Sequence, residues 1–264
     1  MSIFLKSSGR VFIVLIALFS LGCVTTTDAP VKDKKGNNKS AVEDYVQMGM
    51  RYLNNGSRDA AIGAFTRAIE IDKKSAEAHQ GLAMVYQLNG EKELAEKSFK
   101  RALKGRADFS MSGVKNSYGR FLFENGRVKE ALDYFEDAGK DLQYRGRSSS
   151  MLMVGRCAIV LGDKIRAKGA FEYALNLNPR LAAASLELAD MFYQERDYAE
   201  AKKYLDQFAK NSKHIPRSLW LGIRIERTFG NKDKEGSYAL SLKNLHPYSK
   251  EYLEYKKYIE EQEK

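Results

Sequence analysis

The sequence predicts an all-α protein: a solenoid of about six stacked helix hairpins with a capping helix at its C-terminal end. Three observations support this. An alanine followed by apolar residues four and seven positions later recurs along the chain, with the first alanines 34, 36, 36 and 34 residues apart. Twelve residues before each of them stands a glycine or alanine, and four copies have a glycine five residues before. The recurring sets are Ala61/Phe65/Ala68, Ala95/Phe99/Ala102, Ala131/Phe135/Ala138, Ala167/Phe171/Ala174 and Ala201/Leu205/Phe208.

This spacing has a direct physical meaning. Residues at i, i+4 and i+7 lie on one face of a helix, and a glycine suits the left-handed turn that ends one helix before the next begins. Each unit is therefore a hairpin that must stack on its neighbours to bury its apolar face. At about 42–213 the chain resembles the tetratricopeptide (TPR) family, which implies a right-handed superhelical solenoid. The proline that closes the family's repeats is present only at Pro179, so the turns between repeats should vary.

The N-terminal segment, residues 1–22, has the pattern of a bacterial signal peptide. Lys6 and Arg10 precede an apolar run from Val11 to Leu21, which is too short to span a bilayer as a helix. The run ends in Ser20-Leu21-Gly22-Cys23, which resembles a lipobox, the motif whose cysteine is acylated. The resemblance implies a lipid anchor on Cys23 and placement in the outer membrane, facing the periplasm. The alternative is an ordinary cleaved signal followed by a chance cysteine.

Residues 23–40 are expected to form a flexible, lipid-anchored linker, because they are rich in Thr, Asp, Lys, Gly and Asn and offer little to bury. Residues 41–213 then hold five TPR units, and residues 214–247 a divergent sixth. Trp220 to Ile225 open this sixth unit like a first helix, but its second helix lacks the alanine and phenylalanine face. The expected helix pairs are 42–55/58–72, 76–89/91–104, 110–125/127–141, 147–161/163–176, 181–195/197–210 and 215–229/232–245.

Pro247 ends the sixth unit, and residues 248–264 are expected to form a charged capping helix. Tyr252, Tyr255 and Ile259 share the face that would pack on the last hairpin. The end of a solenoid needs such a cap, because its last unit has no further neighbour to cover it.

The sequence carries no pattern typical of an enzyme, a cofactor site or a metal site. The three histidines, His79, His214 and His246, lie in separate units, and no glycine-rich phosphate loop follows a strand. Cys157 is interpreted as a buried structural residue. Without the leader the chain keeps 42 basic and 34 acidic residues, because Lys6 and Arg10 are removed from 44. Export argues against nucleic acid as a partner, and no small-molecule substrate is expected.

The TPR resemblance implies that the first helices of the hairpins line a concave groove, with the residue after each small residue pointing into it. The candidate groove has an apolar start and a basic middle. An alternative is that its methionines only pack within the hairpins. A carboxylate-clamp adaptor is not expected, because Val46 and Met50 occupy positions where that class carries Lys and Asn. The candidate residues are Val46, Met50, Leu53, Gln80, Met84, Asn116, Arg120 and Arg156.

The complete layout resembles one family, the type IV pilus biogenesis and stability lipoproteins of the PilF/PilW type. The C-terminal stretch from Trp220 through Ser237-Tyr-Ala-Leu-Ser-Leu to Pro247 adds to this resemblance. The family implies a non-catalytic pilotin that binds subunits of the pilus secretin and promotes their assembly at the outer membrane. Alternatives from the same structural class are a scaffold for outer-membrane barrel assembly or for peptidoglycan enzymes. An enzyme that uses TPR units as a substrate platform is a further alternative.

Overall fold

The structure is a computed structural model that describes residues 34–107 and 111–262. Within these ranges the chain forms thirteen helices, and an isolated bridge pairs Ser75 with Arg106. The helices are α1 (Lys34–Asn54), α2 (Arg58–Ile71), α3 (Ala76–Asn89), α4 (Lys92–Leu103), α5 (Met111–Glu124), α6 (Val128–Lys140), α7 (Arg147–Val160), α8 (Lys164–Leu177), α9 (Ala182–Gln194), α10 (Tyr198–Asn211), α11 (Pro216–Thr228), α12 (Lys232–Leu245) and α13 (Lys250–Gln262).

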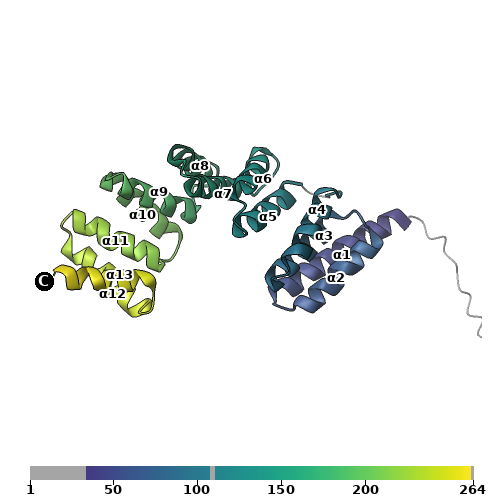
Figure 1. Ribbon diagram of the computed structural model, residues 1–264, viewed down its shortest axis with the longest axis horizontal. Coiled ribbons are helices and arrows are strands. Elements are labelled where there is room, and N and C mark those ends of the chain that lie inside the picture. Colours follow the sequence, from purple (N-terminus) through teal and green to yellow (C-terminus); the bar gives the residue numbers. More distant parts are fainter. Residues whose placement is uncertain (1–33, 108–110, 263–264) are drawn as a thin grey trace, which may run out of the picture.

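Helices α1 to α12 pack as six consecutive hairpins, and α13 packs on α11 and α12 at the C-terminal end. The hairpins follow one another along an arch (Figure 1). In the middle of the arch α6 and α8 lie on the outer side, and α5 and α7 on the inner side (Figure 1). The fold class predicted from the repeat spacing is confirmed.

Each intact hairpin is held together by its repeated phenylalanine. Phe65, Phe99, Phe135 and Phe171 are fully buried. The small residue on the first helix leaves room for this ring: a Cβ built on Gly155 would lie 2.3 Å from Cε1 of Phe171. In this hairpin α7 and α8 can therefore approach closely because Gly155 has no side chain at the crossing.

The same phenylalanines also join neighbouring hairpins. The ring of Phe99 on α4 lies with its centroid 5.5 Å from those of Tyr118 and Phe121, both on α5 of the next unit. In the first unit the ring of Phe65 meets both Gly49 on α1 and Gly81 on α3. The repeated phenylalanine thus packs both within its own hairpin and against the next one, which explains why the spacing recurs so regularly.

The turn inside each hairpin requires a left-handed backbone. The four glycines five residues before the repeated alanines have φ between 76° and 82°. The fifth hairpin has Arg196 at this place, with φ of 63°, the single non-glycine residue with positive φ in the described ranges. Any residue with a Cβ is disfavoured in this conformation by about 1 kcal/mol or more.

Replacing Arg196 by glycine is therefore expected to stabilise the protein by about 1 kcal/mol, because the left-handed turn would no longer strain a side-chain-bearing residue. Urea unfolding of the two proteins measures the difference. Gly162→Ala is the matched control at the fourth turn, where an added Cβ meets nothing within 4 Å and only the backbone conformation matters. It should destabilise by a similar amount. Equal stability of Arg196→Gly and the parent would contradict this account.

The structure differs from the sequence-based expectation at the N-terminal end. Helix α1 begins at Lys34 instead of residue 42, so the last part of the predicted linker, 34–40, is helical. The rest of the predicted linker, the predicted signal peptide at 1–22 and the predicted lipidation site Cys23 lie outside the described residues. No helix in the described part of the chain is long and apolar enough to cross a membrane.

The sixth hairpin and the cap pack much as expected. On α12, Ala239 and Leu242 are buried, and the ring of Tyr238 lies against Gly222 on α11, where the first four units place phenylalanine. Tyr252 and Tyr255 of α13 pack on the cluster that contains Leu242, so α13 covers the exposed side of the last hairpin.

Candidate partner-binding surface

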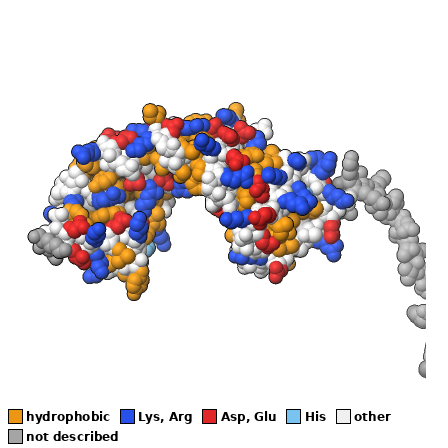
Figure 2. Space-filling view, in the orientation of Figure 1, with side chains coloured by type: hydrophobic (Ala, Val, Ile, Leu, Met, Phe, Trp, Pro, Cys, Tyr) orange, Lys and Arg blue, Asp and Glu red, His pale blue; other side chains and the backbone are white. Residues whose placement is uncertain are grey.

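The concave face of the arch is made by the first helices of the hairpins. Helix α1 contacts α3, α3 contacts α5, α5 contacts α7, and α9 contacts α11. Because these helices touch across repeats, they form the inner side of the curve, and the space-filling view shows a wide hollow beneath it (Figure 2). Side chains on this face are the candidates for contact with a partner, as expected for this architecture.

The N-terminal part of this face is apolar. Val46, Met50 and Met84 are each partly buried: Val46 packs beside Val42, and the two methionines beside the cluster that contains Phe65 and Val85. We call Val46, Met50 and Met84 the apolar strip. Methionine side chains are flexible, so partly exposed methionines can adapt to a partner.

Leu53, predicted to belong to the groove, does not extend this strip. It is 8% exposed and packs with Ala61 and Phe65 inside the first hairpin. At position 53, near the end of α1, the helix turns its side chain towards α2, so we assign Leu53 to the core.

Two predicted groove residues in the middle of the face bind neighbouring repeats. Gln80 on α3 donates through Nε2 to Ser117 Oγ on α5 at 2.7 Å. Asn116 on α5 accepts through Oδ1 from Ser150 Oγ on α7 at 3.2 Å. These side chains are on the predicted helices, but their polar atoms already hold consecutive first helices together.

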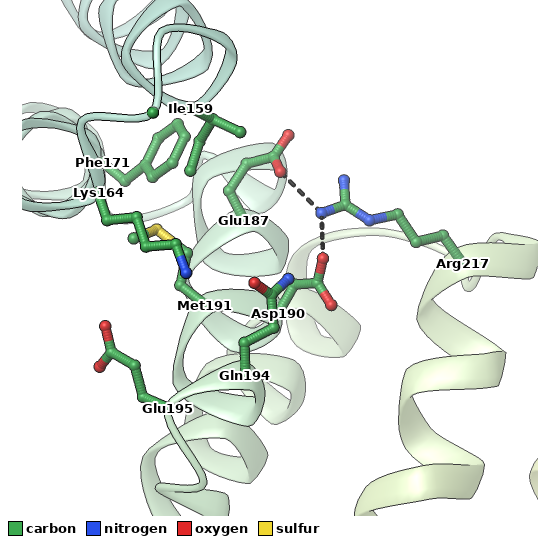
Figure 3. Close-up of a pocket in the computed structure, with 10 residues that line it drawn as sticks. Ile159, Lys164, Phe171, Glu187, Asp190, Met191, Gln194, Glu195 and Arg217 are labelled. Carbon is green, nitrogen blue, oxygen red and sulfur yellow. Dashed lines mark hydrogen bonds and ion pairs between the residues drawn. The ribbon is translucent and has the colours of Figure 1, made fainter.

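The C-terminal half of the face carries a network of charged residues. Arg156 on α7 donates through Nε to Glu187 on α9 at 3.0 Å. Arg217 on α11 binds Glu187 at 2.8 Å and Asp190 at 2.9 Å (Figure 3). The two carboxylates raise the pKa of Arg217, although its burial acts in the opposite direction. Arg156, predicted to line the groove, is therefore half of an ion pair with Glu187.

A small cavity of about 170 Å³ opens beside this network. Its apolar wall is formed by Ile159, Phe171 and Met191, and its polar wall by the Glu187–Arg217–Asp190 group (Figure 3). Sequence reasoning missed Glu187 and Arg217. The available signal was the pair of opposite charges, Arg156 and Asp190, at matching positions of neighbouring repeats.

Arg120 on α5 is the second arginine predicted for the groove, and it differs from Arg156 in its surroundings. Its side chain is exposed, and in the described part of the chain it makes no hydrogen bond or ion pair. It lies at the junction between the apolar strip and the C-terminal charge network. The concave face thus runs from apolar residues, through a free guanidinium, to a set of paired charges.

The described residues can also be searched for a metal site or a reactive side chain, neither of which the sequence predicts. No cluster of His, Cys, Asp and Glu within them could hold a metal ion. His79 is buried, with Nε2 3.1 Å from the carbonyl oxygen of Lys73. Cys157 is fully buried, and burial raises the pKa of its thiol to about 11, so it is a poor nucleophile.

Comparison with known proteins gives the class first. The tetratricopeptide repeat model matches residues 46–110 and 155–216. Solved TPR structures superpose on this chain, including the Cut9 chain of the Cut9–Hcn1 assembly at a TM-score of 0.65 and 16% identity, a likeness that shows the fold alone. The molecule is a TPR solenoid.

More specific relatives give the family. The type IV pilus assembly protein PilF of Pseudomonas aeruginosa is 38% identical over 92% of this chain and 96% of its own. A solved structure of P. aeruginosa PilF has a TM-score of 0.79 at 37% identity, covering 83% of this chain and 98% of that one. PilW, described as a widely conserved type IV pilus biogenesis factor, has a TM-score of 0.69 at 25% identity, covering 80% and 96%. This chain belongs to the PilF family of type IV pilus assembly proteins.

Proposed function

We propose that the protein is an outer-membrane lipoprotein that acts as a pilotin: it binds subunits of the type IV pilus secretin and promotes their assembly. It works as a binding protein, without catalysis. The observation that carries the proposal is the match to PilF along nearly the whole chain, in a fold whose inner surface is built for protein contact. The secretin is proposed as the partner because the layout of the sequence resembles that of the PilF/PilW-type lipoproteins.

The apolar strip is the proposed contact. Val46, Met50 and Met84 form the most apolar part of the concave face, whereas its C-terminal half is occupied by paired charges. Burying apolar surface against a partner contributes roughly 25 cal/mol per Å² before ordering costs are subtracted. Contacts over three such residues can therefore supply several kcal/mol.

A double substitution of Met50→Glu and Met84→Glu is expected to abolish secretin multimers and surface pili, because charges would stand where the partner's apolar residues must sit. Secretin multimers on immunoblots and piliation by electron microscopy measure the effect. Both methionines also touch the first hairpin's core, so circular dichroism must show that the variant is folded.

A milder pair, Met50→Gln with Met84→Gln, removes the apolar contact without adding charge and should weaken assembly in the same direction. Leu142→Glu with Leu245→Glu is the control, since both leucines are well exposed and lie outside the first helices. Normal secretin rings from the folded Met50→Glu/Met84→Glu protein would refute the apolar strip as the contact. Crosslinking to barrel-assembly proteins or peptidoglycan enzymes in place of secretin would refute the pilotin role.

The lipid anchor is proposed at Cys23. A single acyl chain binds membranes only marginally, while each additional buried methylene contributes about 0.8 kcal/mol, so a triacylated cysteine anchors the protein stably. Cys23→Ser is expected to leave the protein unprocessed or soluble in the periplasm. Metabolic labelling with palmitate and membrane fractionation measure this. Parent protein that takes up no labelled palmitate would show that the anchor is absent.

A further inference from the structure

Consecutive repeats place an arginine at the same position of the concave face but give it different surroundings. Arg120 and Arg156 each follow the small residue of their first helix and lie 36 residues apart. Arg156 finds a carboxylate on the next first helix, because Glu187 accepts from its Nε at 3.0 Å. The residue at the matching position one repeat earlier is Met153, two residues before Gly155 as Glu187 is two before Ala189. Arg120 therefore meets no acid there.

The other nearby acid and amide do not pair with Arg120 either. Glu124, one turn further along α5, accepts from Gln87 Nε2 at 2.6 Å. Asn116, one turn earlier, accepts from Ser150 on α7. No hydrogen bond or ion pair joins either side chain to Arg120 in the part of the chain that the structure describes. An exposed guanidinium thus stands on a face where Arg156, Arg217 and Arg224 all contact carboxylates.

We propose that Arg120 recognises an acidic side chain of the protein partner, immediately beyond the apolar strip. This inference rests on the proposed function and adds to it the chemistry of the partner segment. Met50, Met84 and Arg120 occupy the same position in three successive repeats, on α1, α3 and α5, which contact one another in that order, so they follow one line along the concave face. A segment lying on that line would carry two apolar side chains and then, on the same side, an Asp or Glu.

The two parts of this surface contribute differently to binding. Apolar contacts supply most of the affinity, whereas a charge at the edge of a contact mainly steers association and fixes the register of the partner. Arginine suits this role because its planar guanidinium can bind both oxygens of a carboxylate at once. Lysine at the same place would keep the charge but lose that geometry.

The test is to titrate the purified full-length lipoprotein in detergent with the purified secretin subunit. Arg120→Glu is expected to weaken binding by about tenfold or more, and Arg120→Lys by less, within the range measured for charge pairs at protein contacts. Arg101→Glu is the matched control: Arg101 is exposed on α4, outside the first helices, and its reversal changes the net charge equally. It should leave the affinity unchanged. Circular dichroism verifies the fold of each variant.

The outcomes separate this inference from the proposed function. If the parent protein does not bind the secretin subunit, the proposed function fails. If it binds and Arg120→Glu binds equally well, or if Arg101→Glu weakens binding as much, specific recognition by Arg120 is wrong while the pilotin role stands. An Asp→Arg or Glu→Arg change in the secretin that restores binding to Arg120→Glu would identify the acidic residue.

Discussion

Replacing Phe99 by alanine is expected to lower the free energy of unfolding by about 3–5 kcal/mol, the usual cost of deleting a buried phenylalanine ring. Phe99 is fully buried and joins two hairpins, because its ring packs against Tyr118 and Phe121 of the following unit. The substitution removes contacts within α3–α4 and across the joint to α5 together. Thermal and urea unfolding followed by circular dichroism measure the change.

The control for Phe99→Ala is Leu142→Ala, since Leu142 is 79% exposed and its truncation removes little buried surface. Hydrogen exchange should show the loss of protection concentrated in α3 to α6, because each repeat of a solenoid is stabilised by its immediate neighbours. Unchanged stability of Phe99→Ala would mean that the repeats do not pack in this register.

Replacing Lys202 by methionine is expected to destabilise the protein by about 3 kcal/mol, because it leaves a buried carboxylate without its cation. Glu226 on α11 is 3% exposed; Lys202 on α10 binds it, and Asn231 Nδ2 donates to its second oxygen at 3.1 Å. The pair thereby links the fifth hairpin to the sixth. Urea unfolding measures the loss.

The double variant Lys202→Met/Glu226→Leu shows whether the loss comes from the unpaired carboxylate, because it removes the carboxylate as well as the lysine. Replacing both members of a buried ion pair by apolar residues is often close to neutral, so the double variant should recover most of the stability. If Lys202→Met were as stable as the parent, the ion pair would have no structural role. If the double variant were less stable than the single one, Glu226 would be needed for more than this pair.

The architecture could be predicted from the sequence because it repeats. The alanine and phenylalanine spacing fixes which helix faces meet, and the glycine at five of the six hairpin turns fixes where the first helix ends. The beginning of α1 could not be predicted, since Lys34 to Lys39 contain no strong helix-forming pattern. Once Val42 is packed against Ala68 and Ala78, extending the helix backwards is far easier than starting one.

The candidate surface could be predicted in part. The position of Met50, Met84, Arg120 and Arg156 on the first helices followed from the repeat register, but their partners did not. Whether an arginine is free or paired depends on the residue that the next repeat places opposite it, Met153 for Arg120 and Glu187 for Arg156. To know which residue lies opposite an arginine, one must know how far each first helix is shifted along its neighbour. The spacing of the repeats along the chain does not give that shift.

The hydrogen bonds between first helices have a consequence for the size of the whole molecule. Gln80–Ser117 and Asn116–Ser150 fix the angles at two consecutive joints in the middle of the arch. Several hairpins lie on either side of these joints. A small rotation of one hairpin against the next therefore moves the distant end of the arch by a much larger distance. These two short polar contacts therefore help to set how far the C-terminal cap stands from the N-terminal hairpin, and with it the span of a partner complex that the arch can accommodate.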